Sequence, residues 1–231
     1  MFAPRQDWDT LTAQFSAEGR VRIPNALPQD VAESLHQQLA TIPYALMVSV
    51  NGRGQALAPA DLESLDERGR VALQQQVHQD AARGSGFAYD GHQLRGSTDP
   101  SLRAILDRLN APETLERVRQ ITGISELTHM DGQATRYLPG HFLTRHLDDP
   151  QGEQRRVAFV LSLTKQWHPD WGGLLQFYER DGTPLDAWAP AFNALTLFNV
   201  RQHIHSVTFI APFAQAPRLS ITGWVRTGAP Q

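Results

Sequence analysis

The second half of this chain is a succession of short apolar segments separated by turn-forming residues. From about residue 126 the segments are rich in β-branched and aromatic residues, and Gly, Pro, Asp or Asn stands between them. This composition is typical of β-strands. The clearest of the expected strands cover residues 155–163, 174–178, 194–198, 204–210 and 219–225. Many short strands in succession predict an antiparallel sandwich or barrel.

The first half is richer in helix-forming residues. Val31, Leu35 and Leu39 recur at four-residue steps, which predicts a helix that begins near Pro28. Other expected elements are a helix over 61–83, two helices within 100–122 separated at Ala111-Pro112, a strand at 20–23, and a strand at 45–50 followed by an Asn51-Gly52 turn. The first half is therefore expected to form a helical layer on the β-core.

The two halves are not separated by a linker, and 231 residues are enough for one sizeable core. The expected architecture is a single domain over residues 1–231, with a helix-rich supporting part at 1–125 and a β-core at 126–231. The predicted fold class is α+β with a mainly β core.

The composition excludes several classes of function. A formal net charge of -3 gives no reason to expect nucleic-acid binding. No stretch approaches the roughly 18 uninterrupted apolar residues of a membrane span. The absence of cysteine excludes disulfides, thiolate metal sites and cysteine nucleophiles. The N-terminal sequence MFAPRQDWDT also lacks the apolar region of a secretory signal, so we expect a soluble, cytoplasmic protein.

The pattern His-x-Asp occurs at four places: His78/Asp80, His129/Asp131, His146/Asp148 and His168/Asp170. Residues i and i+2 share a face in a strand but diverge by about 200° in a helix. The pair at 78 and 80 lies in the expected helix, so we interpret it as a solvated helix face. The pair at 168 and 170 lies in a loop rich in Pro and Gly, and the pair at 129 and 131 in a strand or bend.

The pair His146/Asp148 is the best candidate for a metal site. It closes a strand-like run over 140–147, and the end of a strand at a barrel mouth directs side chains inward while a loop leaves access. A third ligand has to come from a distant strand. His203 and His205 are both available in the late segment HIHSVTF, and strand alternation does not separate them.

The segment RLSITGWV at 218–225 carries a second polar feature. Alternation places Arg218 and Ser220 on one face. An arginine fork with a neighbouring hydroxyl is a natural receptor for a carboxylate. The alternative is a surface strand whose polar face lies in water.

Taken together, His146-x-Asp148, a late histidine and Arg218 resemble the iron(II)/2-oxoglutarate-dependent dioxygenases of the prolyl-hydroxylase type. The resemblance extends over the segments RYLPGHFLTRH, RRVAFVL, WGGLLQFY, NALTLF, HSV and RLSITGW. Their order is most similar to the catalytic domain of the ribosomal-protein prolyl hydroxylases and their bacterial relatives. The similarity covers residues 130–226 well and the N-terminal half only loosely.

The resemblance implies a double-stranded β-helix, the jelly-roll core of cupins. It implies that His146, Asp148 and His205 bind Fe(II), because the family has a His-x-Val pattern at this point, and that His203 has a supporting role. It further implies that Arg218 binds the distal carboxylate of 2-oxoglutarate. The residues expected to assist Arg218 are Tyr137 and Ser220.

The activity that the resemblance implies is hydroxylation of an unactivated C–H bond with O2 as co-substrate and release of succinate and CO2. Ascorbate is the reductant that the family would allow. A prolyl residue of a protein or peptide, with the translation machinery as one source, is the favoured substrate. The alternatives are a free amino acid or other small molecule, and a cupin-like metal-binding protein without turnover. Tyr89 and Trp171 are the candidates for packing on a proline ring at the rim.

Overall fold

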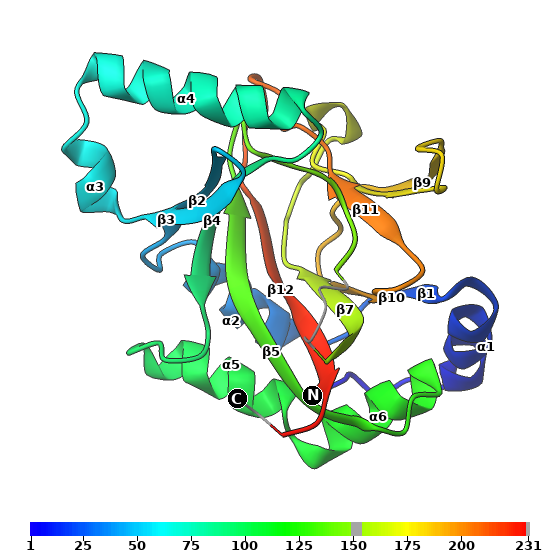
Figure 1. The fold of residues 1–231 in the computed structure, drawn as a ribbon. Coiled ribbons are helices and arrows are strands. Elements are labelled where there is room, and N and C mark those ends of the chain that lie inside the picture. The colour runs from blue at the N-terminus through cyan, green and yellow to red at the C-terminus, as the bar shows by residue number, and fades with distance from the viewer. Residues whose placement is uncertain (149–153, 230–231) are drawn as a thin grey trace.

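A computed structural model describes residues 1–148 and 154–229, in which one curled antiparallel sheet lies among helices (Figure 1). The strands are β1 (Arg20–Ile23), β2 (Ala45–Val50), β3 (Arg53–Leu57), β4 (Phe87–Gln93), β5 (Leu127–Tyr137), β6 (Phe142–His146), β7 (Arg155–Ser162), β8 (Leu175–Tyr178), β9 (Pro184–Trp188), β10 (Ala194–Asn199), β11 (Ile204–Val207) and β12 (Arg218–Thr227). The helices are α1 (Trp8–Glu18), α2 (Gln29–Leu39), α3 (Pro59–Glu63), α4 (Glu67–Ala82), α5 (Pro100–Leu109), α6 (Pro112–Thr122) and the short η1 (Pro169–Trp171).

The sheet is a curled half-barrel. The strand order is β1-β10-β7-β12-β5-β4-β6-β11-β8-β9, and the β2–β3 hairpin is attached to β4. Strand β4 pairs with both β5 and β6 and so joins the two halves of the sheet. This architecture confirms the predicted α+β class with a core resembling the double-stranded β-helix.

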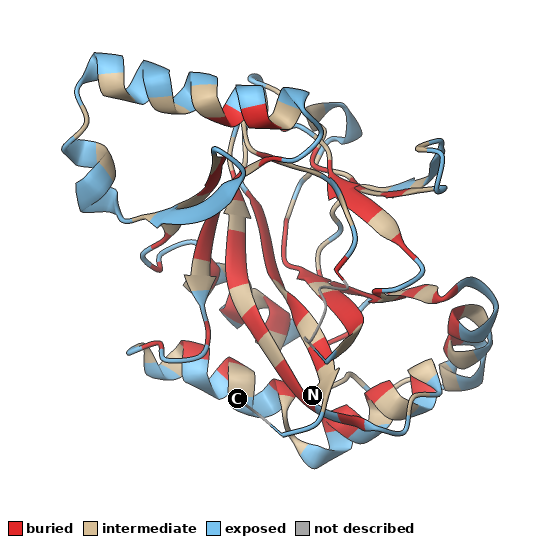
Figure 2. Ribbon diagram, in the orientation of Figure 1, coloured by how far each residue is buried: buried red, intermediate tan, exposed pale blue. Residues whose placement is uncertain are grey.

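Helices lie at both ends of the half-barrel. In Figure 1, α5 and α6 lie beneath β5, while α4 crosses the opposite end. Figure 2 shows buried residues along β5, β7 and β12 and on the inner faces of the helices. The main hydrophobic cluster draws on both halves of the chain, from Leu11 of α1 to Val225 of β12. The single-domain division over 1–231 stays a prediction, and residues 149–153 and 230–231 lie outside the described part.

Most expected elements are present. The strands at 20–23 and 45–50 have the predicted bounds, and Asn51 and Gly52 form the turn after the second with φ angles of 54° and 70°. The predicted break between α5 and α6 is also confirmed. The single helix over 61–83 was wrong. The segment forms two helices, because α3 ends at Glu63 and the Asp66 side chain begins α4 by accepting a hydrogen bond from the Gly69 amide at 2.7 Å.

None of the helices within residues 1–148 and 154–229 is long and apolar enough to cross a membrane.

Candidate active site

The pairing of β6 with β11 brings two distant histidines together. His146 lies directly opposite His205, and their ring centroids are 4.2 Å apart. The next pair in the register is Leu143 with Val207, so β6 advances three residues while β11 advances two. This bulge lets Leu143 and His146 face the same interior, which simple alternation would not allow.

Asp148 follows β6 and completes a three-residue cluster. One of its carboxylate oxygens lies 3.4 Å from Nε2 of His146, and the other lies 3.5 Å from Nε2 of His205. Asp148 and His205 are buried, and one ligand atom from each of the three residues lies within 4.8 Å of the others. Two ligand atoms at right angles around a metal, each about 2.1 Å from it, are about 3 Å apart. The cluster therefore has the composition and size of a metal site.

The environment keeps Asp148 ionised and His205 neutral, which is the state that a metal needs. Burial, with the neighbouring His146, lowers the pKa of His205 to about 4. Burial opposes ionisation of Asp148, but the hydrogen bond from His146 and the two imidazole charges outweigh it and lower the Asp148 pKa to about 2. The pKa of His146 is raised, because its contacts with Asp148 outweigh burial. The carboxylate thus attracts positive charge into the cluster.

A buried arginine lies in the same cavity as the cluster. Arg218 is only 3% exposed, and this cavity of about 340 Å³ is lined by it together with His146, Asp148 and His205. Its Nη1 donates to Ser220 Oγ at 3.3 Å, while its buried Nε has no acceptor. No carboxylate in the described ranges lies within ion-pair distance of it.

A guanidinium held without an anion in a dry site is costly, and burial lowers the Arg218 pKa. The site therefore fits an anionic ligand.

Two tyrosines form the wall beside Arg218. Tyr137 of β5 is opposite Arg218 in the register, and the guanidinium carbon lies 5.1 Å from the centre of the Tyr137 ring. Tyr89 of β4 stacks on Tyr137 at 5.3 Å, and its hydroxyl accepts a hydrogen bond from Gln133. Burial raises the pKa of both tyrosines, so they remain neutral hydrogen-bonding groups.

The remaining predicted site residues lie as follows. Ser220 does not line the cavity but lies behind Arg218, where its hydroxyl also bonds to Thr135 at 2.7 Å. Tyr89 lies within the cavity wall, whereas Trp171 does not line it. Trp224 also lines the cavity, and it was not among the predicted site residues. Strand alternation from Arg218 could have placed it there.

The other His-x-Asp pairs do not join the cluster. The prediction of a solvated face for His78/Asp80 was wrong for Asp80, which is buried and accepts hydrogen bonds from Ser49 Oγ and the Gly52 amide. The turn after β2 supplies those donors. The other two pairs lie apart: Asp131 pairs with Arg226, and His168 and Asp170 are exposed.

His203 is directed away from the cluster. Its Nε2 lies 3.0 Å from the Glu18 carbonyl oxygen at the end of α1. It precedes the first residue of β11, so strand alternation does not apply to it. The structure therefore brings His205, and not His203, to His146 and Asp148.

The half-barrel and its two-histidine, one-carboxylate cluster beside a buried arginine define the non-haem iron class of oxygenases. Residues 132–226, which contain the whole cluster and Arg218, match the model of the 2OG-Fe(II) oxygenase superfamily. The chain is therefore similar to the 2OG-Fe(II) oxygenases of the prolyl-hydroxylase type. The resemblance noted in the sequence, and the Fe(II) and 2-oxoglutarate that it implied, are thereby confirmed.

Several known proteins are similar to this chain. The chain is 28% identical over 137 residues to the prolyl 3-hydroxylase OGFOD1 of Mus musculus, an alignment that covers 57% of this chain and 24% of that protein. The fold is similar to that of a Pseudomonas putida prolyl-4-hydroxylase, with a TM-score of 0.65, 20% identity, and coverage of 96% and 100% of the two chains. A Trichoplax adhaerens prolyl hydroxylase in complex with a hypoxia inducible factor peptide fragment has a TM-score of 0.65 at 20% identity, with 95% and 89% covered.

Proposed function

We propose that this protein hydroxylates a prolyl residue of a protein or peptide, using Fe(II), 2-oxoglutarate and O2 and releasing succinate and CO2. His146, Asp148 and His205 are the proposed iron ligands, and Arg218 is the proposed receptor for the distal carboxylate of 2-oxoglutarate. The observation that carries the proposal is the buried Arg218, which has no anion among the described residues and lines one cavity with the cluster.

The bound iron and 2-oxoglutarate would together supply the oxidising power for C–H hydroxylation. The protein's own residues position and protect that chemistry. Ser220 and the ring of Tyr137 hold the Arg218 fork in one orientation, so that little freedom is lost when a carboxylate binds. The Tyr137 hydroxyl is proposed to donate to the same carboxylate. Apolar Leu175 and Val207 in the cavity wall exclude water.

Three observations support a peptide substrate. The relatives are named prolyl hydroxylases, and the Trichoplax enzyme was solved with a peptide fragment. The cavity with the cluster lies next to a second groove on the protein surface, because four residues line both. A component of the translation machinery is the proposed source of the peptide, in line with the resemblance to the ribosomal-protein enzymes. A cytoplasmic location is proposed as well, since a chain without cysteine needs no oxidising compartment.

The test of the site combines Fe(II) and 2-oxoglutarate with the protein in the absence of oxygen. We expect the visible absorption band of iron-chelated 2-oxoglutarate to appear in the wild type and to be lost in His205→Ala. His203→Ala is the matched control, because it removes an imidazole two residues away that does not reach the cluster. A band that survives His205→Ala but not His203→Ala would show that the proposed ligand is wrong.

The test of the reaction adds proline-containing peptides and O2, and looks by mass spectrometry for the gain of one oxygen atom. Ascorbate is included as reductant. Succinate formed together with hydroxylated peptide would support the proposal. A normal iron band with no peptide oxidation, but with turnover of a free amino acid, would replace the peptide substrate by a small molecule. A normal band with no turnover of any candidate would favour a metal-binding protein.

A further inference from the structure

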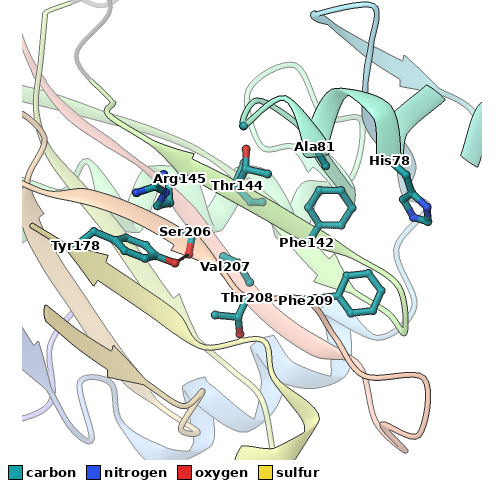
Figure 3. A pocket seen from close by; sticks show the side chains of 12 residues that line it. His78, Ala81, Phe142, Thr144, Arg145, Tyr178, Ser206, Val207, Thr208 and Phe209 are labelled. Carbon is teal, nitrogen blue, oxygen red and sulfur yellow. Dashed lines mark hydrogen bonds between the residues drawn. The ribbon is translucent and has the colours of Figure 1, made fainter. Parts of the chain in front are cut away.

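A second groove, of about 590 Å³, lies on the outer side of the strands that carry the two histidines (Figure 3). Ser206 lies between His205 and Val207 along β11, so its side chain leaves the opposite face of the sheet. The groove is lined by residues of β6, β8 and β11, by the segment after β11, and by the C-terminal end of α4. Its volume is that of a typical ligand site.

The two ends of the groove differ in chemistry, as Figure 3 shows. At one end the rings of Phe142 and Phe209 stack with centroids 6.0 Å apart, next to the end of α4. At the other end the guanidinium of Arg145 lies 5.5 Å from the ring of Tyr178, whose hydroxyl is hydrogen-bonded to Ser206 Oγ at 2.8 Å. One end therefore suits an apolar side chain and the other an anionic one.

The groove adjoins the active-site cavity, since Leu143, Thr144, Arg145 and Val207 line both. Arg145 directly precedes the proposed ligand His146, so the charged end of the groove is the end nearest the cluster. A chain that enters the active site with one residue can continue into the groove with the next ones, since an extended strand advances about 3.3 Å per residue.

The charges of the groove favour an acidic partner. Arg145 is exposed, and no carboxylate in the described part of the chain forms an ion pair with it. Among the described residues that line the groove, Arg145 is the one Arg or Lys, and none is Asp or Glu. A nucleic acid would require several cations along the groove. The exposed Phe209, with 49% of its surface accessible, instead offers an apolar contact that a polypeptide can use.

We propose that this groove binds the segment of the polypeptide substrate that flanks the reacting residue. Arg145 pairs with an acidic side chain about two residues from the reacting position, and Phe209 with Phe142 accepts an apolar side chain further along. This inference rests on the proposed peptide hydroxylase function and adds a sequence preference to it.

The probes are fluorescent peptides of identical length with a central proline, in which each flanking position in turn carries Asp or Lys. Their affinity for the full-length protein is measured by anisotropy at low ionic strength. In the wild type, we expect the Asp form to bind about tenfold more tightly than the Lys form at one position, because the exchange replaces an attraction to Arg145 by a repulsion. Arg145→Glu should reverse that preference. Arg68→Glu, at the far end of α4, should leave it unchanged.

The apolar end is tested in the same way. Phe209→Ser should weaken binding of peptides with a distal Leu about tenfold, while Phe213→Ser is the matched control, since Phe213 is more exposed and does not line the groove. Thermal unfolding checks that each variant is folded, and Arg145→Gln, which removes the charge without reversing it, should abolish the preference.

In the binding assay, the groove proposal would be overturned by equal affinity for the Asp and Lys peptides, or by a preference that Arg145→Glu does not alter. Failure of the proposed function looks different. The same peptides are tested for the gain of an oxygen atom, and a preference that depends on Arg145 without any hydroxylation would support the groove while contradicting the reaction. Hydroxylation that is equally fast in wild type and Arg145→Glu for both peptide forms would support the reaction and contradict the groove.

Discussion

Replacing Arg218 by methionine should have two opposite effects. Methionine has a similar length and no charge, so Arg218→Met removes a guanidinium that is 3% exposed and has no described carboxylate partner. The ligand-free protein should therefore become more stable. The affinity for 2-oxoglutarate should fall, because the proposed partner of the distal carboxylate is lost.

The expected magnitudes follow from the surroundings of Arg218. Replacement of buried ionic groups by apolar side chains of similar volume stabilises proteins by about 1–4 kcal/mol. Methionine keeps the contact with the Tyr137 ring but loses one hydrogen bond to Ser220. We therefore expect the free energy of unfolding to rise by about 2 kcal/mol, which corresponds to an increase of about 4–8 °C in Tm. Two charge-assisted hydrogen bonds to the ligand are together worth about 3–4 kcal/mol, so the Kd for 2-oxoglutarate should rise by about 10²–10³-fold.

The measurements are thermal unfolding without ligand and calorimetric titration of 2-oxoglutarate into the metal-loaded protein. Arg136→Met is the matched control on the neighbouring strand. Arg136 pairs with the buried Asp90 at 2.8 Å and does not line the cavity, so its loss should lower Tm and leave the affinity for 2-oxoglutarate within about twofold. A decrease in Tm for ligand-free Arg218→Met would refute the reasoning, because it would show that the guanidinium has a structural role.

Three further changes test other parts of the structure. Gly223 in β12 has no room for a methyl group, since an added Cβ would overlap the carbonyl of Asp131 and lie 2.6 Å from Gly132 Cα. Gly223→Ala should therefore lower the free energy of unfolding, measured by urea denaturation, by about 3 kcal/mol. Asp66→Ala should lower it by about 1 kcal/mol, because the amide cap of α4 is lost; no change would contradict the cap. The hydrogen bond from the Gly52 amide, with those from Ser49 and Gln76, lowers the pKa of Asp80 in the folded protein. The ionised carboxylate therefore stabilises the fold fully at a pH above the carboxyl pKa of the unfolded chain. This stabilisation is lost as the pH falls through the lower pKa of the folded protein. The stability difference between wild type and Asp80→Asn should accordingly be larger at pH 7 than at about pH 3, and a difference independent of pH would contradict the argument.

The local pattern was sufficient for much of the fold. The bounds of β1 follow from the alternation in RVRI and those of β2 from a mainly apolar run that ends at a turn, and the break between α5 and α6 follows from Ala111-Pro112. The local pattern failed to predict the fold where a side chain, and not the backbone, accepts a hydrogen bond from a helix amide. Asp66 divides the expected helix because its carboxylate caps an amide three residues later, a choice that helix propensity alone does not reveal.

The residue types of the candidate site were also available from the sequence: His146-x-Asp148 at the end of a strand, two late histidines, and an arginine on the polar side of its strand. Alternation could not separate His203 from His205, and only the family resemblance favoured His205. The reason is that the choice depends on the pairing of β11 with β6, together with a bulge in β6, and no property of either segment alone contains that register.

The burial of Arg218 is decided in the same way. Read alone, its strand fitted equally well at the surface with its polar face in water. In the tertiary structure β12 lies between β5 and β7, with Tyr137 opposite Arg218, so the polar face is turned into the cavity. The sequence by itself determined which chemical groups the protein has and which of them alternate on one face. The tertiary structure decided which groups meet, because strands far apart in the chain become neighbours only when the sheet curls and closes its core.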